Sequence, residues 1–284
     1  MSYILEVDNM YKKVDGFTLE NINFKLEPGY IMGLIGRNGS GKTTLIQTLL
    51  GLYQQTSGDI KICGHNVSLE ESKAKGEIGF VLDENPYLED FTSKDNAKIY
   101  APYYKNFDMK LFLSYCNRFD LDPDKKLKKL SKGMVIKFQL AFALSHDAKL
   151  FIMDEPASGL DPVFRKELIE IMYDAILSGD KSILFSTHLT EEIDMIADYV
   201  TLIHDGRQIF STSKEELFDS YRVIKGSDES IEHLRSLVIG EKKTLYTTEA
   251  LVKNDERILN KGCQILIPTI EDIMFYFTKE KNEV

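Results

Sequence analysis

The most informative segment of this sequence is Gly36-Arg37-Asn38-Gly39-Ser40-Gly41-Lys42-Thr43. This stretch fits the pattern G-x-x-x-x-G-K-[S/T], in which glycines let backbone N–H groups turn inward around an anion. The apolar run from Tyr30 to Ile35 precedes it and predicts a buried strand. Leucine and isoleucine at helical spacing follow it as far as Gly51. The order strand, glycine loop and helix predicts a site for the phosphates of a nucleotide.

Within this loop, two side chains have direct roles in the prediction. Lys42 is expected to reach the β- and γ-phosphates, and the Thr43 hydroxyl is expected to bind Mg²⁺. Thr44 follows in the same turn and belongs to the predicted nucleotide-binding set. The expected cofactors are therefore ATP and Mg²⁺.

Two later apolar runs end in polar side chains. Leu150 to Met153 leads into Asp154 and Glu155, and the run Ile183 to Phe185 leads, after Ser186 and Thr187, into His188. In a parallel sheet, ligands bind beyond the carboxyl ends of the strands. Asp154 is expected to hold Mg²⁺ through water, Glu155 to polarise the attacking water, and His188 to contact the γ-phosphate.

The pattern of strands and helices predicts an α/β fold with a mostly parallel sheet of the P-loop NTPase kind. Phe17 to Leu26 alternates like a half-buried strand and belongs to an antiparallel β portion expected near the N-terminus. We expect an ATPase domain over residues 1–215, with a helical insertion at about 86–146, and a small α+β appendage over 216–284. Ser213 and Thr269 are predicted N-caps of helices in the region that follows the ATPase motifs.

Composition excludes some classes of partner. The formal net charge of −10 disfavours nonspecific binding to nucleic acid, which depends on many Lys and Arg side chains. No uninterrupted apolar run approaches the roughly 20 residues of a membrane-spanning helix. The expectation is a chain that stays in the cytosol and serves a membrane, if it does so, through a partner.

These motifs, over roughly residues 2–215, resemble those of the ATP-binding-cassette (ABC) ATPases. Leu130-Ser131-Lys132-Gly133-Met134 resembles the signature motif of that family, and residues 158–161 resemble its dimer-contact loop. The resemblance implies that Ser131 and Gly133 contact the γ-phosphate of ATP bound to an opposite subunit. It also implies that His188 is the switch histidine of the family.

Three positions depart from the family pattern. Asp83 stands where a glutamine that senses the γ-phosphate and Mg²⁺ is usual, and it is expected to serve as a ligand of Mg²⁺. Val14 stands where an aromatic residue usually stacks on adenine, so Tyr11 is considered as its substitute. Lys132 replaces the first glycine of the signature pair and is expected to add positive charge near the phosphates of the partner.

The resemblance implies an ATP-hydrolysing subunit that powers an ABC transporter from the cytoplasmic face of a membrane. Its implied partners are a membrane-spanning subunit and a second ATP-binding subunit, identical or paralogous. The Asp-containing loop and the LSKGM signature resemble those of bacterial exporters of peptides or other amphipathic substrates, such as the staphylococcal exporters of phenol-soluble modulins. Two alternatives are a non-transport ATPase of the same superfamily acting on DNA or ribosomes, and a regulatory nucleotide-binding module without turnover.

Overall fold

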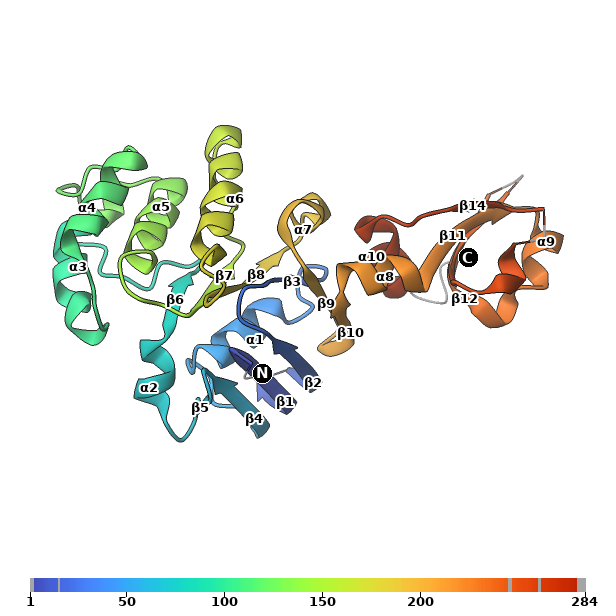
Figure 1. Cartoon of the computed structure of the whole chain (residues 1–284), viewed down its shortest axis with the longest axis horizontal. Coiled ribbons are helices and arrows are strands. Elements are labelled where there is room, and N and C mark those ends of the chain that lie inside the picture. The colour runs from blue at the N-terminus through green and yellow to red at the C-terminus, as the bar shows by residue number, and fades with distance from the viewer. Residues whose placement is uncertain (1–2, 15, 245–246, 260–261, 280–284) are drawn as a thin grey trace.

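The structure is a computed structural model that describes residues 3–14, 16–244, 247–259 and 262–279. The described chain forms two sheets with helices around them, and the molecule is elongated (Figure 1). The larger sheet and most helices lie at one end. The smaller sheet extends to the other end, beyond strand β10 and helix α7 (Thr190–Ile196).

The larger sheet of the described residues has ten strands in the order β5-β4-β1-β2-β10-β9-β3-β8-β7-β6. The strands from β9 to β6 are parallel, whereas β1 pairs with β2 and β4 in antiparallel fashion. The predicted α/β fold with an antiparallel portion is confirmed. The bounds are β1 Leu5–Val14, β2 Phe17–Leu26, β3 Ile31–Ile35, β4 Ser57–Ile62, β5 His65–Asn66, β6 Ile78–Val81, β7 Leu150–Asp154, β8 Ser182–Thr187, β9 Tyr199–His204 and β10 Arg207–Ser213.

The central strands are apolar along their whole length because both of their faces are buried. In β7, Phe151 and Met153 point into the core on one face, and Leu150 and Ile152 into the core on the other. Successive strand side chains point to opposite faces, so a strand covered on both sides has no polar positions in its interior. Its first polar residue, Asp154, comes where the strand ends.

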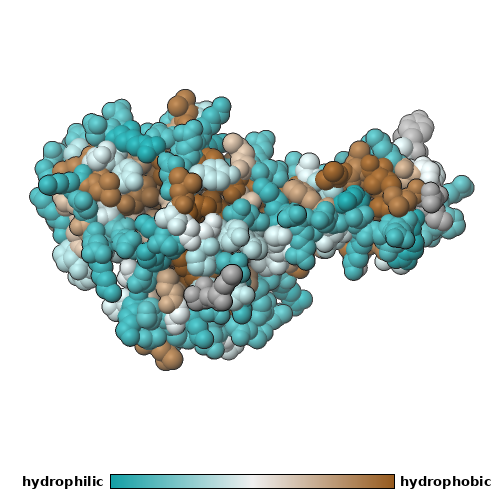
Figure 2. All heavy atoms as spheres, in the orientation of Figure 1, coloured by the Kyte–Doolittle hydropathy of each residue, from teal (hydrophilic) through white to brown (hydrophobic). Residues whose placement is uncertain are grey.

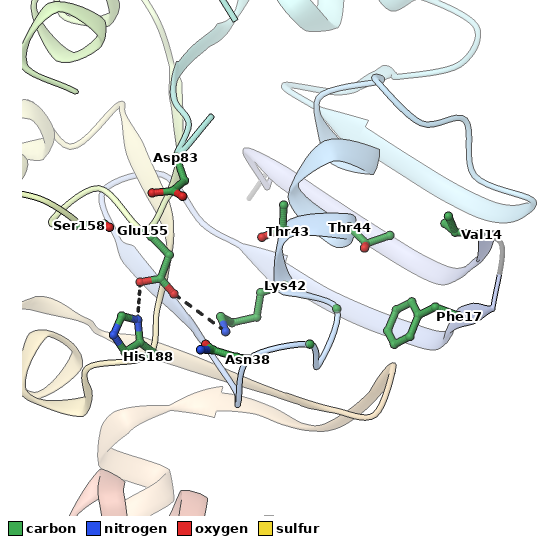
Figure 3. A pocket seen from close by; sticks show the side chains of 12 residues that line it. Val14, Phe17, Asn38, Lys42, Thr43, Thr44, Asp83, Glu155, Ser158 and His188 are labelled. Carbon is green, nitrogen blue, oxygen red and sulfur yellow. Dashed lines mark hydrogen bonds and ion pairs between the residues drawn. The ribbon is translucent and has the colours of Figure 1, made fainter. Parts of the chain in front are cut away.

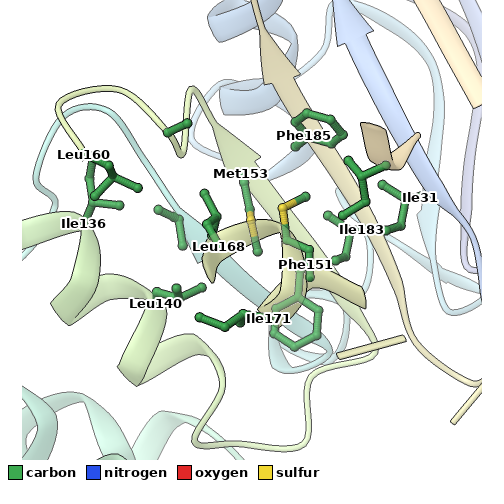
Figure 4. Close-up of a cluster of buried hydrophobic side chains, with 14 of the residues drawn as sticks. Ile31, Ile136, Leu140, Phe151, Met153, Leu160, Leu168, Ile171, Ile183 and Phe185 are labelled. Carbon is green, nitrogen blue, oxygen red and sulfur yellow. The ribbon is translucent and has the colours of Figure 1, made fainter. Parts of the chain in front are cut away.

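Helices cover both faces of this sheet. Helix α1 packs on one face, and Figure 4 shows α5 and α6 side chains, such as Ile136 and Leu168, against those of β7 and β8 on the other. The helix bounds in this part are α1 Lys42–Leu49, α2 Glu71–Gly76, α3 Ser93–Tyr100, α4 Met109–Arg118, α5 Lys132–Ala143 and α6 Pro162–Ile176, with 3-10 turns at Ala101–Tyr103 and Leu127–Lys129.

The stretch from Glu84 to Thr92, at the start of the helical insertion expected at about 86–146, is not helical. This stretch is an irregular loop, and helix α3 begins only at Ser93. Pro86 has no backbone N–H to donate to a helical hydrogen bond. The side-chain amide of Asn96 donates hydrogen bonds to the backbone carbonyls of Leu88 and Thr92 in this loop. The Asn96 side chain therefore stabilises a non-helical path.

The smaller sheet has the order β12-β13-β11-β14 among the described residues. Helix α8 links it to β10, and the predicted N-caps are confirmed: Ser213 accepts from the Glu216 N–H, and Thr269 forms a capping box with Asp272. The bounds are α8 Lys214–Ser220, β11 Tyr221–Gly226, α9 Asp228–Glu232, β12 Val238–Lys243, β13 Thr248–Lys253, β14 Gln264–Leu266 and α10 Ile270–Thr278, with 3-10 turns at Arg235–Leu237 and Glu256–Ile258.

Helix α10 joins the two parts of the molecule. Its buried Ile273 belongs to the same apolar cluster as Ile193 and Ile196 of α7, and the helix also contacts β12 and β13. Gly240 of β12 allows this approach, since a Cβ there would lie 2.6 Å from the Tyr276 carbonyl oxygen. The core of the ATPase-like part thus continues into the C-terminal part.

The visible surface in Figure 2 is mostly hydrophilic, with apolar residues gathered in places on both parts of the molecule. None of the helices in the described ranges has the length and apolar character needed to cross a bilayer.

Candidate functional site

A cavity of about 450 Å³ lies at the carboxyl ends of the central strands. Figure 3 shows its lining residues, which come from the β1–β2 hairpin at one end and from the ends of β7 and β8 at the other, with the glycine loop between them. The lining consists of Val14, Phe17, Asn38, Gly39, Gly41, Lys42, Thr43, Thr44, Asp83, Glu155, Ser158 and His188.

The glycine loop has a backbone that requires its glycines at two positions. Gly36 passes so close to β9 that a Cβ would lie 2.3 Å from the Ile203 carbonyl oxygen. Gly41 is the N-cap of α1 with a φ of 111°, and no side chain caps that helix. The first N–H groups of α1 therefore remain available to an anion at the helix N-terminus.

Lys42 is buried beside this loop. Its ammonium donates to the Gly36 carbonyl oxygen at 2.8 Å and lies 4.0 Å from Oε1 of Glu155. Desolvation lowers the pKa of Lys42, and the attraction of Glu155 and Asp154 acts in the opposite direction. Added negative charge from a phosphate would favour the ammonium form further.

Glu155 lies at the centre of the polar contacts in the cavity. Its backbone has a φ of 48°, and its N–H donates to the Ser186 hydroxyl at 3.0 Å. Its carboxylate oxygen Oε2 lies 2.7 Å from Nδ1 of His188, while Oε1 is the oxygen nearest to Lys42. The carboxylate is thus held between an ammonium and an imidazole, where it can accept a proton from a water molecule.

Asp154, the other carboxylate of the pair, lies deeper. It is 3% exposed, and its Oδ1 accepts from the Ser186 hydroxyl at 2.5 Å. Asp154 does not line the cavity itself. The two carboxylates therefore occupy different environments, one buried beneath the site and one inside it.

The cavity offers oxygen ligands suited to Mg²⁺. The Thr43 hydroxyl and the Asp83 carboxylate both line it, and Mg²⁺ prefers oxygen ligands, including those of substrate phosphates. No cluster of three or more His, Cys, Asp or Glu residues that could hold a metal occurs in the described ranges. With the Thr43 hydroxyl and the Asp83 carboxylate as its protein oxygens, the site fits an Mg²⁺ ion that takes its other ligands from phosphate oxygens and water.

The structure brings together most of the predicted site, but some residues lie elsewhere. Tyr11 does not line the cavity, and its strand position pairs with Ser57 on the side of β4. Ser131 is an exposed N-cap of α5, and Gly133 is buried behind it. Arg37 and Ser40 line a separate cavity of about 200 Å³, together with Asn38 and Gly39.

Phe17 lines the cavity, although it is not among the residues predicted for the site. Phe17 lies directly opposite Val14 in the hairpin, so the aromatic ring stands across the strand pair from the position where one was expected. A Cβ on Gly41 would lie 2.7 Å from the Phe17 Cζ, which places the ring against the glycine loop. The available signal was the pairing of neighbouring strands, in which opposite residues share one face.

The signature-like segment contacts the 158–161 loop within the chain. A Cβ on Gly133 would lie 2.6 Å from the Gly159 carbonyl oxygen, so only glycine fits there. Ser158, from the same loop, also lines the cavity, which the sequence analysis did not predict. The start of α5 and the wall of the cavity are therefore in direct contact.

Lys132, which is expected to add positive charge near the phosphates of a partner, contacts residues of its own chain. Its ammonium lies 2.5 Å from Oδ1 of Asp83 and donates to the Ser158 hydroxyl at 3.2 Å. Asp83 and Lys132, two of the three departures from the family pattern, are thus paired inside one chain, a contact that the sequence alone does not predict. A helix N-terminal lysine can reach both loops because its stem is long and flexible.

A family model described as "ABC transporter" matches residues 19–158, and an "AAA domain, putative AbiEii toxin, Type IV TA system" model matches residues 126–194. Nod factor export ATP-binding protein I of Cupriavidus metallidurans is 33% identical over 227 residues, which cover 78% of this chain and 74% of that protein. The bacitracin transport ATP-binding protein BcrA of Bacillus licheniformis is 32% identical over 213 residues, which cover 73% and 69%. A solved structure described as the ATP-binding subunit of an ABC transporter matches with a TM-score of 0.70 and 25% identity, over 75% of this chain and 91% of that one.

Proposed function

Because the chain belongs to the ABC transporter family, and is an ATP-binding and ATP-hydrolysing subunit that powers transport, we propose that it drives a bacterial exporter of peptides or other amphipathic substrates. A relative named for Nod factor export supports this direction of transport, and a relative named for bacitracin transport supports a role in transport. The proposal that this subunit hydrolyses ATP at this site rests on one observation: the Glu155 carboxylate lies between Lys42 and His188 in one cavity.

We propose the following roles within that cavity. Lys42, the glycine-loop N–H groups and the N-terminus of α1 bind the phosphates, because all three present positive charge or donors to one point. Glu155 acts as the general base toward water, and His188 orients it and contacts the γ-phosphate. Thr43 and Asp83, with Asp154 through water, would hold Mg²⁺, which supplies charge neutralisation at the phosphates.

The nucleobase has a place at the opposite end of the cavity. Val14 and Phe17 stand there, away from Glu155 and His188, as Figure 3 shows. An aromatic face stabilises a stacked base by about 1–3 kcal/mol. We propose that Phe17 takes the stacking role that the sequence analysis considered for Tyr11.

The proposed assembly contains two such subunits and a membrane-spanning partner at the cytoplasmic face. Ser131 and Gly133 would contact the γ-phosphate of ATP held by the opposite subunit, and the exposed position of Ser131 at the start of α5 is compatible with that role. Residues 1–215 would form the ATPase domain, with residues 216–284 as an appendage. Closure would depend on ATP because these contacts across subunits exist only in the closed state.

The test has two parts. Tagged Glu155→Gln chain is purified from its native cells in detergent with ATP and Mg²⁺, and co-purifying proteins are identified by mass spectrometry. A membrane-spanning subunit, absent when Lys42→Ala is used as bait, is the expected result. Recovery of ribosomes or DNA-bound proteins without a membrane subunit would overturn the transport assignment.

The direction of transport is tested by a second measurement. The transporter with its membrane subunit is placed in vesicles, and uptake of a labelled amphipathic peptide into inside-out vesicles is followed with ATP. Uptake that depends on Glu155 supports export. Uptake only into right-side-out vesicles loaded with ATP would contradict it.

A further inference from the structure

The ion pair between Asp83 and Lys132 lies at the wall of the nucleotide cavity. Asp83 lines the cavity, and its Oδ1 lies 2.5 Å from the Lys132 ammonium. That oxygen is buried and has no hydrogen bond of ordinary geometry within the described residues. Its negative charge is therefore balanced by the Lys132 ammonium. Without Lys132, a carboxylate would face the place where a triphosphate binds.

Lys132 is held in this position by its surroundings. It is the first residue of α5, directly after the N-cap Ser131. Its Cγ and Cδ would lie 3.4 Å from a Cβ on Gly159, and its ammonium donates to Ser158. The side chain therefore runs along the 158–161 loop to reach Asp83, and it connects the start of α5 to two walls of the cavity.

The negative charge of Asp83 and the positive charge of Lys132 compensate each other. An uncharged pair at these positions, such as the glutamine and glycine usual in the family, brings no net charge to the cavity wall, and an aspartate with a lysine brings none either. A single exchange would leave one unit charge beside the phosphates. We infer that Lys132 is a positioning residue that neutralises Asp83 at the nucleotide cavity and links the signature segment to it, so that the two positions act as one unit.

This inference rests on the proposed function only in that the cavity binds ATP. For ATP without metal, it predicts opposite effects of the two single variants and no net effect of the double variant. Lys132→Gln should weaken binding because Asp83 then repels the phosphates, and Asp83→Asn should tighten it because Lys132 then attracts them. Asp83→Asn/Lys132→Gln should return to about the wild-type affinity.

The expected size of each single effect is modest. Asp83 and Lys132 are 39% and 49% exposed, so solvent screens their interaction with the phosphates. About a two- to fivefold change in Kd is expected for each single variant in EDTA at low salt. The changes should shrink in 0.5 M NaCl because the screening length falls well below 10 Å.

The experiment is a double-mutant cycle on the purified full chain. The Kd of a fluorescent ATP analogue is measured in EDTA and in excess Mg²⁺ for the wild type, both single variants and the double variant. The matched control is Asp90 with Lys128, an ion pair of the same 2.5 Å length at an exposed site outside the cavity. Asp90→Asn and Lys128→Gln should leave the Kd unchanged.

The outcomes separate the inference from its alternatives. Single effects of opposite sign that cancel in the double variant support a charge pair at the cavity. Single variants that both weaken binding, equally in EDTA and Mg²⁺ and with lower thermal stability, would show a merely structural contact and overturn the inference. Loss of binding in Lys42→Ala together with single effects at Asp83 and Lys132 that have the same sign, or that the double variant does not restore, would reject the inference alone, whereas cancellation without a membrane partner would reject only the transport assignment.

Discussion

The Oε2 atom of Glu155 lies 2.7 Å from the Nδ1 atom of His188, across the ends of two neighbouring strands. The contact joins the residue that follows β7 to the residue that follows β8, and it keeps the carboxylate inside the cavity. Glu155 has a left-handed backbone, a conformation that costs energy for a residue with a side chain and that recurs at functional sites. The geometry thus directs one carboxylate toward the phosphate end while Asp154 stays buried.

Replacing Glu155 by glutamine should separate binding from hydrolysis. The amide keeps the shape of the side chain but cannot take a proton, so the rate of phosphate release should fall about 10²–10⁴-fold while ATP affinity stays within about twofold. Glu167→Gln in α6, where Glu167 pairs with Arg118, serves as the control because Glu167 lies outside the cavity. A Glu155→Gln variant with the wild-type rate would exclude the general-base role.

Removing the Phe17 ring should weaken ATP binding through the base. Phe17→Ala should raise the Kd of ATP by about fivefold to a hundredfold, in line with about 1–3 kcal/mol for a stacked base. Binding of inorganic tripolyphosphate, which has no base, should change little. Tyr11→Ala is the matched control and should bind ATP like the wild type. If tripolyphosphate lost affinity equally, Phe17 would act by supporting the Gly41 loop instead.

The buried His146 should make stability depend on pH. Burial, with a smaller contribution from Lys181, lowers the pKa of His146 to about 4, against the opposing effect of Asp147. Between about pH 6.5 and pH 4 the unfolded chain binds this proton and the folded chain does not, so stability falls as pH falls, by up to about 1.4 kcal/mol per pH unit.

The test of this pH effect compares the wild type with His146→Phe. Phenylalanine keeps an aromatic ring against Tyr104, whose ring centroid lies 4.4 Å from that of His146. Chemical denaturation at several pH values should give a shallower loss of unfolding free energy for the variant between pH 6.5 and 4. Parallel curves for both proteins would mean that other groups account for the acid sensitivity.

The core shared by α7 and α10 should contribute strongly to stability. Ile273 is fully buried in the same cluster as Ile193, so Ile273→Ala should lower the unfolding free energy by about 2–4 kcal/mol. Ile267→Ala, at a position 73% exposed just before the helix, should change it by no more than about 0.5 kcal/mol. Equal effects of the two substitutions in a denaturation experiment would argue against this packing.

Much of the fold followed from local patterns in the sequence. The strand over Phe17–Leu26, the strand and helix around the glycine loop, and the caps at Ser213 and Thr269 all agree with the structure. These features depend on neighbouring residues: alternating burial, a side chain that accepts from an N–H three residues on, and glycines that allow positive φ. Such short-range requirements can be read along the chain.

Other features needed the folded chain. The loop from Glu84 to Thr92 lacks helix because Asn96, later in the chain, binds its backbone. Phe17 enters the cavity through its cross-strand position, and Tyr11 turns out to stand outside it. Neither result is visible from composition or helical spacing.

The phosphate loop, the two carboxylates at the end of β7 and the histidine after β8 could be predicted from the sequence alone, because each is a local motif whose chemistry depends on residue type and spacing. The contact between Asp83 and Lys132, and the fact that Glu155 rather than Asp154 faces the cavity, depend on how the elements pack in three dimensions. Residues 49 positions apart in the first pair come within 2.5 Å only when the strand, the loop and α5 are packed together. Pairing of charges is a property of distance in space, and chain order does not encode that distance directly.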